Sequence, residues 1–315
     1  MESLRRYMDR GRRITLEKSS KMQYGALKSL TGALLLILIS SPALAGDGTG
    51  ESDRIEFVVG NLVFVMLHEF SHLIIEDFDV PVLGNSEDAA DTLAAVTLIR
   101  ADRAHPEGDF RLIRMLLTAA DGNRILWQRG LEQENPAIYL ARHPLSVQRA
   151  ARIACLAYGS ELELLEPLPE IVGLPEFRAD WCEEEYEDAE RAWLWIRDSF
   201  VRNASGTANE HQFVYGSTRD PDHQAIREWL VQHEALERAV AYVDRTMLLP
   251  GAITLRTRSC GSPDAYWDGN ARDLVICYQL IEAFYQLSEE EGIKELVEKI
   301  RTFHRDNPAG NENEE

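Results

Sequence analysis

The sequence predicts an α+β protein that is mostly helical and carries a small β-sheet or hairpin late in the chain. Helical patterns cover most of the sequence, whereas the three short runs that have strand composition all lie between residues 212 and 278. We find no internal repeat and no long linker. The roughly 270 residues that follow position 45 suffice for one large domain.

The first 45 residues are predicted to be a signal peptide and not part of the fold. Lys28 precedes an apolar run at 33–39, and Ala-Leu-Ala at 43–45 forms a small-x-small cleavage site. The run is too short for a comfortable transmembrane helix, so we expect an exported protein, periplasmic or secreted, with no stable membrane insertion after cleavage. An uncleaved anchor is the alternative, and Met22 is an alternative start.

The mature protein is expected to form a single domain at 46–306, followed by a polar, disordered tail at 307–315. Without the eight basic and three acidic residues of 1–45, it holds 25 basic and 50 acidic residues, a net charge of −25. That charge argues against partners such as nucleic acid or an anionic membrane surface. The sequence leaves the oligomeric state open.

The first helix is expected over Phe57–Ile75, because this segment is apolar on nearly every face and too long for a buried strand. It contains the pattern H-E-x-x-H. His68 and His72, four residues apart, lie one turn apart on one face, so both imidazoles can reach one ion. Glu69 can reach a water on that ion without ligating it. Burying such groups is costly unless they are paired or bind a metal.

The second helix follows a loop at 77–85 that contains Pro and Gly. Ser86 is expected to be its N-cap, and the helix should continue through Ile99. If it packs antiparallel to the first helix, Glu87 points back at the histidines as a third metal ligand. Asp91, one turn further on, can hold a ligating imidazole by its free N–H.

This ligand set indicates catalytic zinc, which keeps three protein ligands and one water whose pKa falls to about 7. Glu69 would take the water proton and pass it to the leaving amine. The sequence therefore predicts a Zn²⁺ peptidase with a peptide or protein substrate. Two alternatives stay open: a zinc-stabilised binding or structural protein without turnover, and an amidase that acts on peptidoglycan peptides.

These residues resemble the gluzincin metallopeptidases, the thermolysin-like group in which H-E-x-x-H is followed by E-x-x-x-D. The resemblance implies a zincin-like core in which His68, His72 and Glu87 are the ligands. It also implies that Glu69 is the base and that Asp91 orients His68. The gap from His72 to Glu87 is shorter than in thermolysin.

Nearly the whole mature chain is similar to a bacterial family of unknown function whose members are assigned as metallopeptidases from this motif. The similarity bears on the fold more than on the substrate. The stretches that carry it are 60–64, 143–149, 155–159, 182–186 and 260–278.

Four cysteines in an exported chain predict two disulfides. Three pairings are possible. Cys155–Cys182 and Cys260–Cys277 are favoured because each pair links neighbouring elements. Neither pair has zinc-finger spacing.

The remaining elements are assigned from pattern and composition. Helices are expected near 110–128, 146–157, 176–200, 222–246 and 279–302. Strands are expected at 212–215, 253–257 and 274–277, with the last two forming a hairpin.

Known zincins place a sheet before the H-E-x-x-H helix, and an edge strand of that sheet lines the cleft. Here only about ten residues precede that helix in the mature chain. We therefore expect a permuted order, with the sheet supplied late and the substrate adding a strand to its edge. A structure with no strand near the His68 face would refute this expectation.

A peptidase also needs a donor for the oxyanion of the attacked carbonyl. The candidates by residue type are Tyr266, His143, His211, Tyr215 and Arg149. His143 has the alternative of simply starting a helix, and Tyr266 that of packing in the core. His223 and His233 are expected to face solvent on a helix.

Overall fold

The computed structural model describes residues 49–104, 111–128, 143–200, 209–238, 240, 249, 251–289, 299 and 302. The predicted signal peptide and the predicted tail lie outside these residues. So do parts of the helices that we expected at 222–246 and 279–302.

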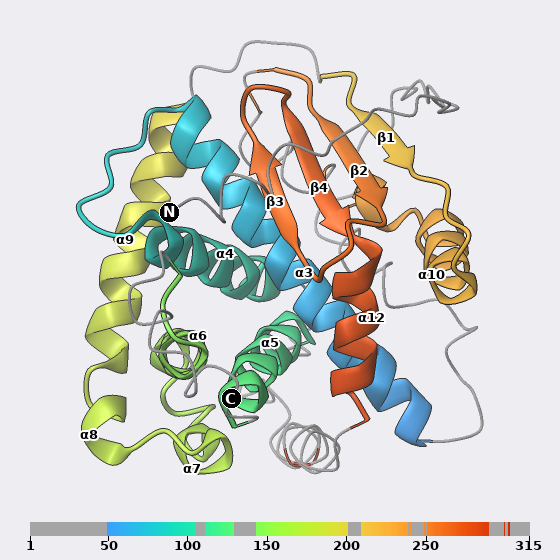
Figure 1. The fold of residues 1–315 in the computed structure, drawn as a ribbon. Coiled ribbons are helices and arrows are strands. Elements are labelled where there is room, and N and C mark those ends of the chain that lie inside the picture. Colours follow the sequence, from blue (N-terminus) through green and yellow to red (C-terminus); the bar gives the residue numbers. More distant parts are fainter. Residues whose placement is uncertain are drawn as a thin grey trace, which may run out of the picture.

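Helix α3 (Thr49–Asp77) is the central element of the fold. It runs between the sheet on one side and helices α4 (Ser86–Arg103) and α5 (Arg111–Gln128) on the other (Figure 1). Its stretch Asp53–Asp77 is long and apolar enough to cross a membrane, but 78% of its apolar 18-residue segment is buried inside the protein. This burial is typical of a core helix, as the all-round apolar pattern predicted.

Among the described residues, two longer and two shorter helices also lie on the helical side of the molecule. Helix α6 (Ser146–Ser160) packs against α5 and against α9 (Cys182–Phe200). Helices α7 (Leu168–Val172) and α8 (Glu176–Ala179) lie between them in sequence. The helix expected at 176–200 is therefore divided. The disulfide Cys155–Cys182 ties α6 to the start of α9, as the favoured pairing predicted.

The four-stranded sheet has the order β1-β2-β4-β3. Strands β1 (Gln212–Tyr215), β2 (Thr254–Arg258) and β4 (Asp273–Cys277) are parallel, and β3 (Ala265–Asp268) pairs with β4 in the antiparallel direction. The predicted hairpin of 253–257 with 274–277 is therefore wrong. The segment between those strands contains β3, which forms the hairpin with β4 and returns the chain so that β4 runs parallel to β2.

The fold class is confirmed: the protein is mostly helical, and its small sheet comes late in the chain. Helices α10 (Pro221–Gln232) and α12 (Tyr278–Leu287) pack against each other, and α12 also packs on α3. The second disulfide, Cys260–Cys277, connects the end of β2 to the end of β4.

Three local expectations need correction. Asn85, not Ser86, is the N-cap of α4, because its side chain accepts a hydrogen bond from the Glu87 backbone N–H at 3.1 Å. His223 and His233 are buried, not solvent-facing. His223 lies between Ser259 and Glu282, at 2.9 and 3.2 Å from its two ring nitrogens, so its burial leaves both nitrogens paired.

Candidate metal centre

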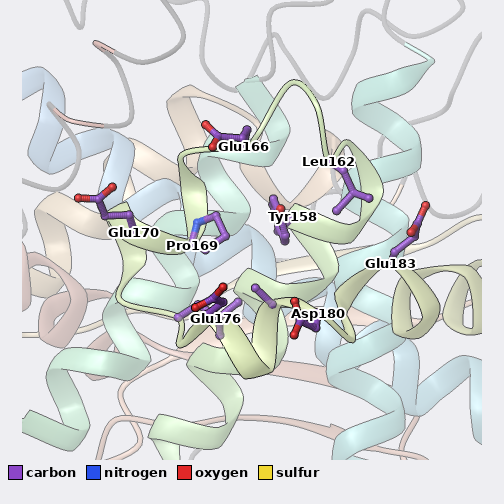
Figure 2. A pocket seen from close by; sticks show the side chains of 10 residues that line it. Tyr158, Leu162, Glu166, Pro169, Glu170, Glu176, Asp180 and Glu183 are labelled. Atoms are coloured by element: carbon purple, nitrogen blue, oxygen red, sulfur yellow. The ribbon is translucent and has the colours of Figure 1, made fainter.

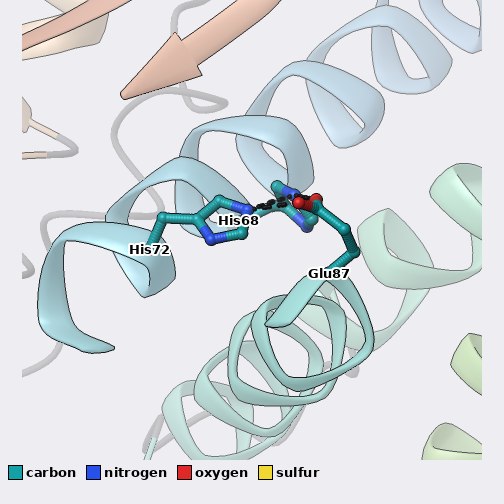
Figure 3. A group of neighbouring side chains, drawn as sticks. All are labelled: His68, His72 and Glu87. Carbon is teal, nitrogen blue, oxygen red and sulfur yellow. Dashed lines mark hydrogen bonds and ion pairs between the residues drawn. The ribbon is translucent and has the colours of Figure 1, made fainter. Parts of the chain in front are cut away.

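His68, His72 and Glu87 meet where α3 packs on the first turn of α4. The Nε2 atoms of His68 and His72 are 3.1 Å apart. Glu87 Oε2 lies 3.3 Å from the first nitrogen and 3.2 Å from the second. The three side chains point at one another from two helices (Figure 3). Two histidines four positions apart and a glutamate 15 positions after the second thus form a nearly equilateral triangle of ligand atoms.

This triangle fits a small tetrahedral cation. An ion with ligand bonds of about 2.0–2.1 Å in tetrahedral geometry separates its ligands by about 3.3 Å, close to the three distances observed. Two imidazoles and one carboxylate are also the donor types that zinc takes in catalytic sites. His68 and Glu87 are buried, and ion binding is one way to offset the cost of burying polar groups.

Asp91 and Arg149 hold the His68 ring through Nδ1, the nitrogen that does not belong to the triangle. The carboxylate of Asp91 lies 2.7 Å from His68 Nδ1, so it fixes the ring with Nε2 directed at the triangle. Arg149 donates two hydrogen bonds to Asp91, at 2.8 and 2.7 Å. Arg149 therefore binds Asp91 and is not aimed at the triangle as an oxyanion donor. The side chain of Asp91 is 1% exposed, so a paired cation compensates its charge.

The charges of this cluster shift several pKa values. Burial lowers the pKa of His68, but hydrogen bonds to Asp91 and Glu87 outweigh burial and raise it to about 9. Burial raises the pKa of Glu87, but the hydrogen bond with His68 and the charges of His143 and His72 bring it down to about 2. Glu87 is therefore an anion at neutral pH, as a metal ligand must be.

Glu69 lies beside the triangle but outside it. Its Oε2 accepts a hydrogen bond of 2.8 Å from the backbone N–H of Trp267 in β3. Burial raises the pKa of Glu69 to about 7, against the opposing effects of His68 and this hydrogen bond. Strand β3 thus lies next to the histidines, on the side of Glu69. The expected permuted order required a strand near the His68 face, and β3 is such a strand.

The candidate oxyanion donors are placed very differently. His143 Nδ1 is 3.1 Å from Glu87 Oε2, and 62% of its side chain is exposed. Tyr266, on β3, receives a hydrogen bond from Arg258. The side chain of Tyr215 donates to Glu237, and His211 accepts from the Ile253 backbone, so both tie the sheet to its surroundings.

A pocket on another part of the protein is lined by none of these residues, and Figure 2 shows the side chains that line it. It is a hollow of about 580 Å³ between α6 and the segment that leads into α9. Tyr158 and five acidic side chains, among them Glu170 and Asp180, contribute to its lining. None of the triangle residues borders it, so the chemistry of the candidate site does not depend on this pocket.

Two contacts of the site could not be found by sequence reasoning. The Trp267 amide is a backbone group, and no residue type marks it in advance. Arg149 was considered only as an oxyanion donor, because its pairing with Asp91 spans 58 positions. One signal was present: Asp91 was expected to lie beside a ligating imidazole at the packed face of two helices, where a carboxylate needs partners for its charge.

The chain matches the family described as "Putative metallopeptidase" (DUF4344) over residues 41–196 and 215–306. No curated protein and no solved structure matched the chain. The matched segments include His68, His72 and Glu87, together with β2, β3 and β4. Since the match covers well over half of the sequence, the chain belongs to this metallopeptidase family.

Proposed function

We propose that the protein is an exported zinc peptidase that hydrolyses peptide bonds with Glu69 as general base and acid. The observation that carries this proposal is the triangle of His68, His72 and Glu87 with the Glu69 carboxylate beside it. Membership of the metallopeptidase family supports a hydrolase that uses a metal. Zinc is proposed because it suits both the donor types and the spacing of the triangle.

The three triangle residues would hold the ion, and Asp91 would keep His68 in the ligating orientation. A bound zinc ion supplies a Lewis acid that polarises a carbonyl and lowers the pKa of water. Glu69 removes a proton from the attacking water and delivers it to the leaving nitrogen. The Trp267 amide steadies the Glu69 carboxylate through Oε2, which leaves Oε1 for the proton transfer.

The substrate is proposed to bind as an extended strand along β3. The β3–β4 register pairs Tyr266 with Val275, and Asp264 accepts a hydrogen bond from the Cys277 backbone. Hydrogen-bonded positions alternate in an antiparallel pair, so the backbone groups of Ala265 and Trp267 face away from β4. An incoming peptide can pair with the backbone of Ala265 and the carbonyl of Trp267 on this edge, as extended peptides do, while the Trp267 N–H stays on Glu69.

Export is supported by the two disulfides, which are typical of oxidising compartments. The predicted signal peptide at 1–45 would deliver the domain to the periplasm or the medium. The charge of the mature chain makes nucleic acid and anionic membrane surfaces poor partners.

The test compares peptide hydrolysis by the wild type and by Glu69→Gln, with zinc content measured on the same samples. The expected result is full zinc content in both and a loss of roughly 10²–10⁴-fold in turnover in the variant. Glu56→Gln is the matched control, since Glu56 lies on the same helix but pairs with Arg114 at 3.1 Å. Equal turnover in Glu69→Gln and the wild type would remove Glu69 from the reaction.

A wild-type protein that holds zinc but hydrolyses no peptide would instead favour a zinc-stabilised binding protein. Hydrolysis confined to peptidoglycan peptides would favour the amidase.

A further inference from the structure

The last turn of α3 is fastened to the β3–β4 hairpin by two side-chain contacts. Trp267 Nε1 donates a hydrogen bond of 2.6 Å to Glu76. Arg272 donates two hydrogen bonds of 2.8 Å to the carboxylate of Asp77. The backbone at Gly269 passes so close to the Glu76 carboxylate that a Cβ at this position would collide with it. We call Glu76, Asp77, Trp267 and Arg272 the hairpin clamp.

Arg272 also makes hydrogen bonds to β2 and to the segment that precedes it. Its backbone carbonyl accepts a hydrogen bond of 2.9 Å from Thr254 in β2, and its Nε donates to the carbonyl of Ala252 at 3.1 Å. It adopts φ +52°, a left-handed conformation that is uncommon for a residue other than glycine. The hydrogen bonds to Asp77 raise the pKa of the guanidinium, although burial opposes this. The ion pair therefore links α3, β2 and the hairpin turn.

Trp267 connects the hairpin clamp to the proposed base, Glu69. Trp267 donates its backbone N–H to Glu69 and its indole N–H to Glu76. These two carboxylates are seven residues apart on α3, so they lie on one face, two turns apart. β3 is a four-residue strand at the edge of the sheet and pairs with β4 on one side only. On its other side it is the contacts with α3 that fix its position.

We propose that Glu76, Asp77 and Arg272 are positioning residues for Glu69. They hold the hairpin against α3 so that the Trp267 amide stays on the Glu69 carboxylate. This inference rests on the proposed function for its effect on catalysis, while its structural part concerns the Trp267 hydrogen bond alone. A displacement of about 1 Å in a catalytic group can lower a rate by roughly 10²-fold, so a loosened clamp is expected to slow turnover.

The experiment uses the full chain loaded with zinc and compares the wild type with Arg272→Gln. Hydrogen–deuterium exchange is measured at the Trp267 amide, and kcat, KM and zinc content are measured on the same samples. We expect exchange at this amide at least about tenfold faster in Arg272→Gln and kcat lower by roughly ten- to hundredfold. Zinc content is expected to change little, because no clamp residue belongs to the triangle, and KM reports separately on the proposed substrate strand at β3.

Two further variants make the result specific to the clamp. Arg191→Gln removes the exposed ion pair with Asp188 on α9 and should leave both the exchange rate and kcat unchanged. The reversed pair, Asp77→Arg with Arg272→Asp, should recover part of both losses, since aspartate tolerates a left-handed backbone better than most residues do. Glu76→Gln serves if Arg272→Gln fails to fold, because it alters one hydrogen bond and leaves the ion pair.

The outcomes separate this inference from the proposed function. If Arg272→Gln has the same exchange rate at the Trp267 amide and the same kcat as the wild type, the proposed role of the clamp is wrong. If the wild type hydrolyses no peptide, the proposed function fails, and the exchange rates alone decide the inference. Faster exchange with unchanged kcat would show a structural tie that does not position Glu69, and this too would overturn the proposal.

Discussion

The structure places His143, one of the candidate oxyanion donors, next to the proposed ligand Glu87. Its Nδ1 lies 3.1 Å from Glu87, while 62% of its side chain remains exposed. We propose that this imidazole is the oxyanion donor, because it lies beside the triangle and is exposed, whereas the hydroxyl of Tyr266 accepts a hydrogen bond from Arg258.

The change His143→Ala is expected to lower kcat by roughly 10²–10³-fold, because it removes a donor to the charge that develops on the attacked carbonyl. Zinc content should stay at the wild-type value, and Tyr266→Phe should have little effect. Steady-state kinetics with elemental analysis of both variants gives the answer. Loss of zinc in His143→Ala would make this residue a ligand instead, and wild-type kcat would leave it without a role.

Asp91 is the second residue on which the site depends. Asp91→Asn removes the carboxylate that holds His68 and leaves the Arg149 cation without its partner. Zinc affinity is expected to fall by roughly 10–100-fold, as for other partners of ligating histidines, and the melting temperature should fall too. A competition titration with a chelator measures the first effect. Asp88→Asn, one turn earlier on the same helix and paired with Arg152, should keep wild-type affinity; equal losses in both variants would contradict the account.

Among the elements, α6 and α9 show how closely the helices approach. A Cβ at Gly159 would collide with the backbone carbonyl of Cys182, which cannot move without shifting α9. Gly159→Ala is therefore expected to lower the free energy of unfolding by about 1–3 kcal/mol. Chemical denaturation measures this change. Gly84→Ala, whose added methyl would meet no atom within 4 Å, is the control; equal stabilities for the two variants would contradict this packing.

The elements also show what a sequence can and cannot predict. Long apolar segments such as 57–75 gave reliable helices, because their pattern reports burial directly. The strands at 253–257 and 274–277 were found from composition, but composition carries no strand direction. The short strand Ala265–Asp268 was missed because turn-forming residues surround it, and so the hairpin was assigned to the wrong pair of strands.

At the scale of the whole molecule, two disulfides join parts that are distant in sequence. Cys155–Cys182 spans 27 positions, and closing a loop of that length stabilises a protein by about 3.5 kcal/mol in the chain-entropy account. The double variant Cys155→Ser with Cys182→Ser should lower the melting temperature in calorimetry, and a reducing agent should lower that of the wild type. A wild type whose melting temperature is insensitive to reductant would contradict this role.

The candidate site is likewise a property of the whole chain. The grouping of His68, His72 and Glu87 could be predicted because helical spacing and one short loop determine it. The contacts of Arg149 with Asp91, of His143 with Glu87 and of the Trp267 amide with Glu69 could not, since each depends on segments far away in sequence that tertiary packing brings to α3 and α4.

Zinc content of the purified protein, measured by elemental analysis beside a His72→Ala control, tests the central claim most directly. The account predicts close to one zinc ion per chain in the wild type and little in the control, because removing one corner of the triangle leaves two ligands. A wild-type protein that takes up no zinc even after supplementation, or a control that retains it, would contradict the metal centre.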